Sequence, residues 1–274
     1  MSLPYITSRR PPPRQQGYTL IEILVALLIG VFLLAGLFTI LQNTRRTSSN
    51  QTALTQLQDE QRMAMSMLND VVQNAGYFDP NTITSAAALP AVSTALPATG
   101  YTLAVSQGLS GSHSATTPGD TIVARYATNG TSSAAPDGLE NCNGATSTAA
   151  QTFTNTFFIA PTVTGNAATD ALWCSLDGST STSTGIPLVS GVENMQVYYG
   201  VATTAGTNNV DTYMTANQVQ TANDWANVTS VRVTLTFFNP LYSQAGYTAA
   251  ASQYIYFTRV IPIQGRTGVI ATAL

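Results

Sequence analysis

Residues 18–41 read YTLIEILVALLIGVFLLAGLFTIL, and this stretch decides the architecture of the chain. It contains 24 residues and one charged side chain, Glu22. As an α-helix it would be about 36 Å long, enough to cross a hydrocarbon core of about 30 Å. A cleaved secretory signal has a shorter apolar region and ends at an Ala-x-Ala-like site, which does not follow here. We therefore expect residues 18–41 to stay attached as the transmembrane part of a helix.

The helical pattern continues beyond Leu41, because apolar residues recur three or four positions apart. They are Leu54, Leu57, Ala64, Leu68, Val71 and Ala75, with Gln61 in the remaining slot, and Met63, Met65, Met67 and Val72 widen the stripe. Gly76 suits the left-handed conformation that ends many helices. The sequence predicts one helix from Tyr18 to Ala75, whose amphipathic part, residues 42–76, packs on a sheet.

Residues 77–274 are expected to form a β-rich head, because β-prone runs alternate there with Gly, Asn and Ser. The runs are Thr121–Ala127, Thr152–Ala160, Ala171–Leu176, Val192–Val201, Val228–Phe238 and Gln253–Ile263. The stretches 79–119, 128–150 and 202–224 are predicted to be surface connections with little regular structure. The fold class is therefore α+β, with a long N-terminal helix packed on an antiparallel β-sheet head.

The charge of the chain argues against nucleic-acid binding. Only 8% of residues are charged, and every basic residue is an arginine. Without the three arginines of residues 1–17, seven basic residues face thirteen acidic ones, a net charge of about −6. Such a head offers no basic patch for a phosphate backbone, so no direct contact with nucleic acid is expected.

Groups suited to catalysis are scarce. His113 is the only histidine, and its Gly-Ser-His-Ser surroundings predict an exposed loop position rather than the buried, oriented one that a Ser–His–Asp site needs. The sequence has no G-x-S-x-G elbow, no P-loop and no G-x-G-x-x-G run. We expect neither enzymatic activity nor a cofactor.

A cluster of oxygen-bearing side chains surrounds one of the two cysteines. Asp137, Glu140, Asn141 and Asn143 could suit Ca²⁺, but their spacing does not fit an EF-hand loop, and such clusters are common in turns. We favour a turn without a metal ion.

The cysteines themselves, Cys142 and Cys174, are separated by 32 positions and lack a C-x-x-C spacing. In an oxidising compartment they would form one disulfide, which is favoured if the head is exported; otherwise two buried thiols remain.

Glu22 needs an explanation, because a carboxylate inside an apolar span costs free energy. It can lie near the interface and reach water, or it can pair with a positive group that the span itself does not supply.

The residues around it resemble the processing site of type IV prepilins and type II secretion pseudopilins: Arg14-Gln15-Gln16-Gly17, then Tyr18-Thr19-Leu20-Ile21-Glu22. In that family prepilin peptidase removes a basic leader, here residues 1–17, by cutting after the Gly, and the new N-terminus is methylated. The fifth residue of the mature chain is Glu, which Glu22 matches, whereas Tyr18 replaces the usual Phe. The resemblance implies that Glu22 pairs with the free α-amine of Tyr18 on a neighbouring subunit.

The head resembles the PilW family of minor pilins. The matching segments are Gly185–Gly200 (GIPLVSGVENMQVYYG), Asn74–Phe78, Arg125-Tyr126, Asn141–Gly144 and Leu172–Cys174. The last of these makes the disulfide more probable. The resemblance implies a type IV pilin-like fold and a low-abundance subunit that primes pilus assembly at or near the tip.

Implied partners are other minor pilins, the major pilin, the inner-membrane assembly platform, prepilin peptidase and a large tip adhesin. The implied location is the bacterial inner membrane, crossed once with the head in the periplasm, and then the pilus on the cell surface. A J-type pseudopilin of a type II secretion system stays open as the alternative. A membrane-tethered enzyme or adhesin would explain neither Gly17 and Glu22 nor the amphipathic extension.

Overall fold

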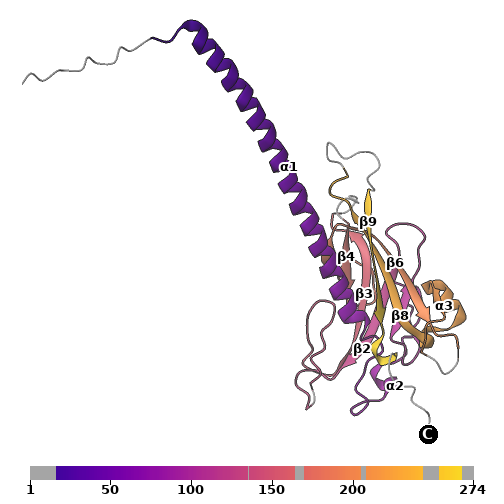
Figure 1. The fold of residues 1–274 in the computed structure, drawn as a ribbon. Coiled ribbons are helices and arrows are strands. Elements are labelled where there is room, and N and C mark those ends of the chain that lie inside the picture. Colours follow the sequence, from indigo (N-terminus) through magenta and orange to yellow (C-terminus); the bar gives the residue numbers. More distant parts are fainter. Residues whose placement is uncertain (1–16, 135, 164–169, 205–207, 243–252, 267–274) are drawn as a thin grey trace, which may run out of the picture. The chain divides into compact units, whose positions relative to one another are not determined.

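The computed structural model describes residues 17–134, 136–163, 170–204, 208–242 and 253–266. The chain divides into two compact units, one ending at Thr52 and the other beginning at Ala53. Helix α1 (Leu20–Val72) contributes to both, and all the strands belong to the second unit. The fold is α+β, as expected, with a long N-terminal helix followed by antiparallel sheets (Figure 1).

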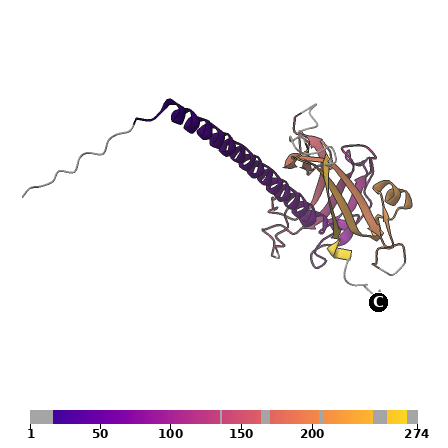
Figure 2. The same cartoon turned by 45° about the horizontal axis from the view of Figure 1, so that its top comes forward.

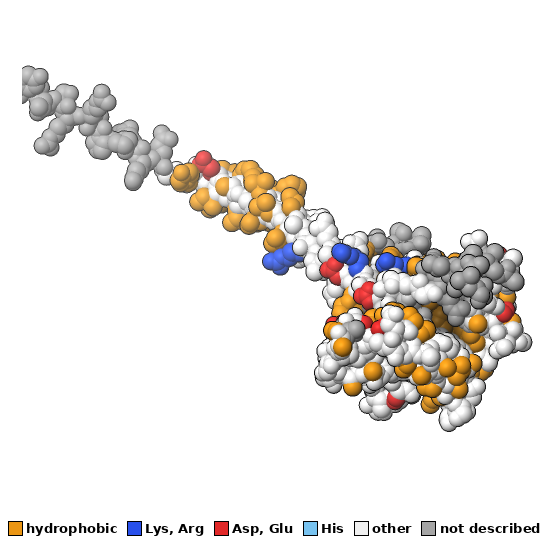
Figure 3. All heavy atoms as spheres, turned by 90° about the horizontal axis from the view of Figure 1, so that it is seen from below, with side chains coloured by type: hydrophobic (Ala, Val, Ile, Leu, Met, Phe, Trp, Pro, Cys, Tyr) orange, Lys and Arg blue, Asp and Glu red, His pale blue; other side chains and the backbone are white. Residues whose placement is uncertain are grey.

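The part of α1 in the first unit exposes its apolar side chains. Leu20 is 77% exposed and Phe32 79%. The helix is long and apolar enough to cross a membrane, and none of its most apolar window is buried within the chain. Figure 3 shows this part of the helix covered with apolar side chains on the visible face. Only lipid or another protein can cover such a surface.

The part of α1 in the second unit buries the predicted stripe. Its buried residues are Leu57, Gln61, Ala64, Met65, Leu68, Val71 and Val72, and Ala75 is buried just beyond the helix. Met63 and Met67 do not join them, because Met63 is 50% exposed and Met67 half-buried. These two methionines lie four positions apart on the flank of the stripe, where a helix turns its side chains away from the core.

The helix ends earlier than the sequence suggested, at Val72 rather than Ala75. Turns continue to Gly76, which has a φ of +81° as expected for a residue that ends a helix. Its N–H, however, donates to the carbonyl of Arg125 at 2.8 Å rather than to a helix carbonyl. The neighbouring sheet therefore stops the helix.

Within the described part of the chain, nine strands form two antiparallel sheets. The first has the order β1-β2-β3-β4-β5, and its strands are β1 (Leu109–Ser112), β2 (Thr121–Thr128), β3 (Gln151–Pro161), β4 (Asp170–Ser175) and β5 (Ile186–Ser190). The second has the order β7-β6-β8-β9, and its strands are β6 (Val192–Val201), β7 (Thr212–Met214), β8 (Val228–Phe238) and β9 (Tyr254–Pro262). The expectation of one sheet was wrong. The chain changes sheets at Gly191, the single residue between β5 and β6, with a φ of +76°.

Two stretches predicted to lack regular structure contain short elements. Residues 79–119 include α2 (Ser85–Ala88) and β1, and residues 202–224 include β7 and α3 (Ala216–Ala222), followed by the 3-10 helix η2 (Trp225–Asn227). Strand β5 was also missed. The last element, η3 (Gln264–Arg266), is a further 3-10 turn. Strand β1 reads LSGS and β5 contains Pro187, so neither has the composition of an isolated strand.

Among the described residues, the largest hydrophobic cluster lies between the two sheets and the end of α1, the elements that Figure 2 draws. On β8, apolar residues alternate with more polar ones, and Val231, Val233, Leu235 and Phe237 are all fully buried. Together with Leu68 of α1 they belong to a single cluster.

The loop between β1 and β2 joins the sheets. Gly119 forms a β-bridge to Met195 of β6, and the buried Asp120 carboxylate accepts the N–H of Val197 at 2.7 Å. The same carboxylate accepts the N–H of Ser114 at 2.9 Å, so one side chain ties β6 to the loop between β1 and β2.

Candidate functional site

The residues expected to govern processing and assembly lie at the start of α1. Gly17 and Tyr18 precede the helix, and the Tyr18 side chain is 80% exposed. Glu22 lies in the first turn, where its N–H donates to the Thr19 carbonyl at 3.1 Å. An acid at this end of a helix interacts favourably with the helix dipole. Residues 1–16, including the three arginines of the expected leader, lie outside the described residues.

The Glu22 carboxylate forms no ion pair with any residue that the structure describes. Its neighbours on the exposed helix are apolar, among them Ile21 at 67% and Ile23 at 57% exposure. Burying each such side chain is worth about 1.5–3 kcal/mol, so the first unit gains stability only when lipid or other subunits surround it. The same surroundings would then require a cationic partner for Glu22.

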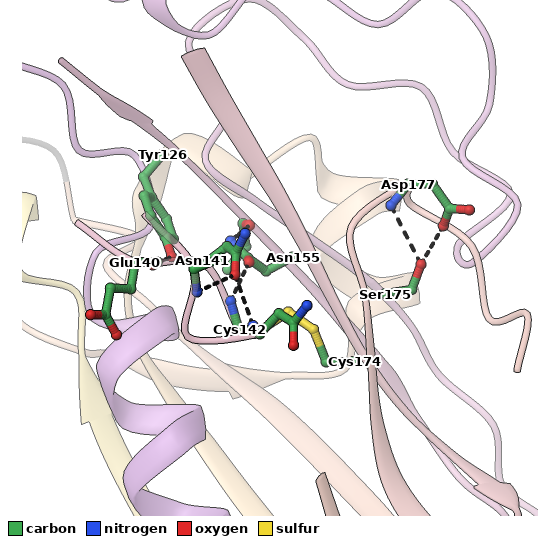
Figure 4. The surroundings of a disulfide bond; sticks show 11 residues. Tyr126, Glu140, Asn141, Cys142, Asn155, Cys174, Ser175 and Asp177 are labelled. Carbon is green, nitrogen blue, oxygen red and sulfur yellow. Dashed lines mark hydrogen bonds between the residues drawn. A yellow bond between two sulfur atoms is a disulfide. The ribbon is translucent and has the colours of Figure 1, made fainter. Parts of the chain in front are cut away.

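A second candidate region is the loop that carries Cys142. The structure joins Cys142 to Cys174 of β4 by a disulfide, with the two Cα atoms 6.2 Å apart, and both residues are buried (Figure 4). The Cys142 N–H donates to Oδ1 of Asn155 on β3 at 2.8 Å. Asn155 is fully buried, and its Nδ2 donates in turn to the Ala124 carbonyl of β2. The loop is therefore fixed to three strands of the first sheet.

Tyr126 of β2 holds the same loop from the core side. Its hydroxyl donates to the backbone carbonyl of Glu140 (Figure 4). Its ring meets that of Phe153 edge to face, with 5.7 Å between the centroids. Burial raises the pKa of Tyr126 to about 12, so the hydroxyl keeps its proton and remains a donor near neutral pH.

Beyond the disulfide, β4 leads into a hydrogen-bonded turn around Asp177. The carboxylate accepts bonds from the hydroxyls of Ser175 and Ser179 and from the Ser179 N–H at 3.0 Å. Partial burial raises the pKa of Asp177, but the hydrogen bonds from Ser175, Ser179 and Thr184 outweigh it and hold the pKa well below its usual value.

The residues weighed as Ca²⁺ ligands form turns instead. The Asp137 carboxylate accepts the Thr128 hydroxyl at 2.6 Å and the Asn129 N–H at 2.8 Å. Oδ1 of Asn141 accepts the N–H groups of Asn143 and Ala145. Their oxygens are therefore directed at donors of their own loop. Over the described ranges, no three His, Cys, Asp or Glu side chains come together as a metal site would need.

A groove of about 570 Å³ lies beside the disulfide. Met63 and Met67 of α1 form one wall, Ile186 and Leu188 of β5 form the other, and the loop of Cys142 closes one end. The sequence did not predict this groove. The one available signal was the choice of methionine at positions 63 and 67 on the flank of the helix stripe. Methionine suits irregular and adaptable surfaces.

Comparison with known proteins gives two family matches. Residues 156–262 match the model of PilW, the type IV pilus-assembly protein W, and residues 12–38 match the prokaryotic N-terminal methylation motif. These two matches support a PilW-family, type IV pilin-like protein. The family is one of pilins that take part in type IV pilus assembly.

Other comparisons add little to this assignment. No curated protein matches the sequence of this PilW-family chain. Among solved structures it matches the type IV-like pilin TTHA1219 from Thermus thermophilus, at 11% identity and a TM-score of 0.34, over 77% of this chain and 98% of that one.

The first family match covers the first candidate region, and the PilW match covers only the strand side of the second. The methylation motif covers Gly17, Tyr18 and Glu22, and together with the long apolar helix it indicates membrane anchoring. The PilW match begins within β3 and ends at Pro262 of β9, so it contains Cys174 but not Cys142.

The structure corrects the expectation for His113 in this PilW-family head. The side chain is only 27% exposed, and its Nδ1 lies 2.8 Å from Oδ1 of Asp120. The Gly and Ser neighbours suggested an open loop, but Asp120 draws this loop into the junction between the sheets. The hydroxyl of the neighbouring Ser114 bonds to Thr116 and not to His113, so it does not complete a triad.

Proposed function

We propose that this chain is a minor pilin that helps to prime type IV pilus assembly at or near the tip. It enters the filament through α1 after prepilin peptidase has cut between Gly17 and Tyr18. Residues 1–17 are the leader, 18–41 the transmembrane part of the helix, 42–76 its amphipathic part, and 77–274 the head. The head lies in the periplasm before assembly and on the pilus afterwards.

The observation that supports the proposal most strongly is a single acid, Glu22, on an otherwise apolar and exposed helix segment, five residues after Gly17 and attached to a PilW-type head. Cleavage after Gly17 would create a positive α-amine on Tyr18. At about 4 Å and an effective dielectric near 20, this amine and a carboxylate attract by about 4 kcal/mol before desolvation is subtracted. The pairing explains why cleavage has to precede assembly.

The pairing also defines the partners. The pair is proposed between subunits, with the amine of one chain meeting Glu22 of its neighbour. Those subunits are other minor pilins and the major pilin, assembled by the inner-membrane platform, with a large tip adhesin as a further partner of the head.

Processing is tested with two glycine variants of the full-length chain, Gly17→Leu and Gly30→Leu. Neither position has a neighbouring atom within 4 Å of an added Cβ, so both substitutions are tolerated sterically. Mass spectrometry should find the wild type and Gly30→Leu beginning at N-methylated Tyr18, and Gly17→Leu with its leader intact. Recovery of a chain beginning at Tyr18 from Gly17→Leu would refute the assigned cut.

Deletion of the gene in its host separates a pilin role from that of a J-type pseudopilin. The proposal expects fewer surface pili, and the chain itself in sheared pilus fractions. Unchanged piliation together with a block in the secretion of folded exoproteins would assign the chain to a type II secretion system.

A further inference from the structure

Arg232 occupies an unusual position on the second sheet. It lies on β8, opposite Tyr198 of β6, and its Cζ is 4.9 Å from the centroid of the Tyr198 ring. Tyr213 of β7 contacts the same guanidinium, with 4.4 Å from Cζ to the ring centroid. Two aromatic rings from two other strands therefore hold one cation.

The donors of this guanidinium are not used within the described part of the head. Arg232 has no ion pair and no hydrogen bond there, and its two close contacts are those to the tyrosine rings. An arginine fork presents five N–H donors in one plane. Because the rings already restrict the side chain, little further conformational entropy is lost when a ligand binds to those donors.

The register neighbours of Arg232 on this sheet face are uncharged, and the acidic Glu193, near the other end of the face, accepts the hydroxyl of Tyr254. Strand alternation places the following residues on the same face as Arg232: Gln196, Tyr198, Ser230, Thr234, Thr236, Tyr256, Thr258 and Val260. The face is open to solvent, since Tyr256 is 66% exposed and Val260 48%. Arg232 is thus a positive charge among uncharged, partly aromatic neighbours.

We propose that Arg232 binds one carboxylate, the side chain of an Asp or Glu that another protein subunit presents to this face. One guanidinium matches one monovalent carboxylate through two parallel hydrogen bonds. A phosphate or a polyanion would call for several cations, and the acidic charge of the head would repel it. Tyrosine and arginine are also the residue types that dominate binding energy in protein interfaces.

The inference concerns the head alone, so it stands whether or not the chain enters a filament. A purely structural role for the Arg–Tyr contacts would stabilise the sheet without creating a preference for acidic ligands. The two roles therefore differ in a measurable binding property.

The test uses the full-length chain in detergent micelles and fluorescence anisotropy with two labelled peptides, Thr-Glu-Thr-Glu-Thr and Thr-Gln-Thr-Gln-Thr. The wild type should bind the Glu peptide about 10-fold more tightly than the Gln peptide. Arg232→Gln should remove the preference, and Arg232→Lys should reduce it, because lysine keeps the charge but not the fork.

The matched control is Arg259→Gln. Arg259 is an exposed arginine of β9, and its register partner Val233 faces the core. Arg259 therefore lies on the opposite side of the sheet from Arg232. This variant changes the net charge equally and should keep the preference. Thermal unfolding of each variant shows whether it is folded. If Arg232→Gln is not folded, the affinities of the wild type and of Arg232→Lys for the two peptides test the proposal.

Three results would overturn the proposal. They are equal binding of the two peptides by the wild type, a preference that survives in Arg232→Gln, or an equal loss in Arg259→Gln. If D-glucuronate binds in a way that depends on Arg232 and the two peptides bind equally, the ligand of the Arg232 guanidinium is an acidic sugar and not a protein carboxylate.

Discussion

Two leucines on the same helix show how differently the two units are built. Leu33, in the first unit, is 62% exposed, whereas Leu68, in the second, is completely buried among residues of both sheets. The head buries its core apolar residues against other residues of the same chain. The N-terminal segment leaves them uncovered, together with the unpaired Glu22, and so depends on lipid and on other subunits for its stability.

The largest expected effect lies in the N-terminal unit. Glu22→Ala should leave cleavage intact but lower incorporation into pili by about 10-fold or more, because the charge that would pair with a neighbouring amine is lost. Immunoblots of sheared pili against whole cells measure this. Asp59→Ala, which removes an exposed acid from the second unit, is the control and should incorporate normally. Equal incorporation of both variants would count against the pairing.

Removal of the disulfide should affect only the head. Cys142→Ala with Cys174→Ala opens a loop of about 33 residues and should lower the free energy of unfolding by about 3.5–4 kcal/mol. Denaturant titration measures the change, and reduction of the wild type should lower its stability by a similar amount. Glu22→Ala should show no such loss. A double variant as stable as the wild type would mean that Tyr126 and Asn155 hold the loop without the disulfide.

The two leucines provide the most direct test of the comparison. Leu68→Ala should cost about 3 kcal/mol of head stability, since it leaves a cavity in a closely packed core. Leu33→Ala should leave the unfolding of the head unchanged and act only on filament incorporation. If both variants destabilised the head equally, the division of α1 between the two units would be wrong.

The smallest effect concerns pH. Because the pKa of Asp177 is lower in the folded head than in the unfolded chain, its ionised form stabilises the head above about pH 4. This stabilisation is lost as the pH falls from there towards the lowered folded-state pKa. The melting temperature of Asp177→Asn should therefore be below that of the wild type at pH 6, and the difference should shrink below pH 4. A difference independent of pH would contradict this assignment.

Local patterns predicted the elements that depend on local rules. The alternation along β8 and the stripe that includes Leu57 and Leu68 were readable, because each pattern repeats with the period of its own structure. The spacing from Gly17 to Glu22 was readable for a different reason, its resemblance to the processing site of prepilins. Helix α3 also had a local signal, the capping box of Thr215 and Gln218, which the prediction overlooked.

Long-range pairing was not readable in this way. Nothing in the composition of β1 or β5 requires a strand, since both are defined by the neighbours that they meet. The change of sheet at Gly191, the contact of Tyr126 with the Cys142 loop and the stacking of Arg232 between two tyrosines all join distant parts of the chain. They follow from tertiary contacts and carry no periodic signal.

Asp120 gives the head a mechanical property. Its buried carboxylate ties Val197 of one sheet to the loop that leads into the other, beside the bridge from Gly119 to Met195. A pulling force applied to either sheet is passed to the other through these bonds. The two layers should therefore rupture together, as one block, when the head is stretched.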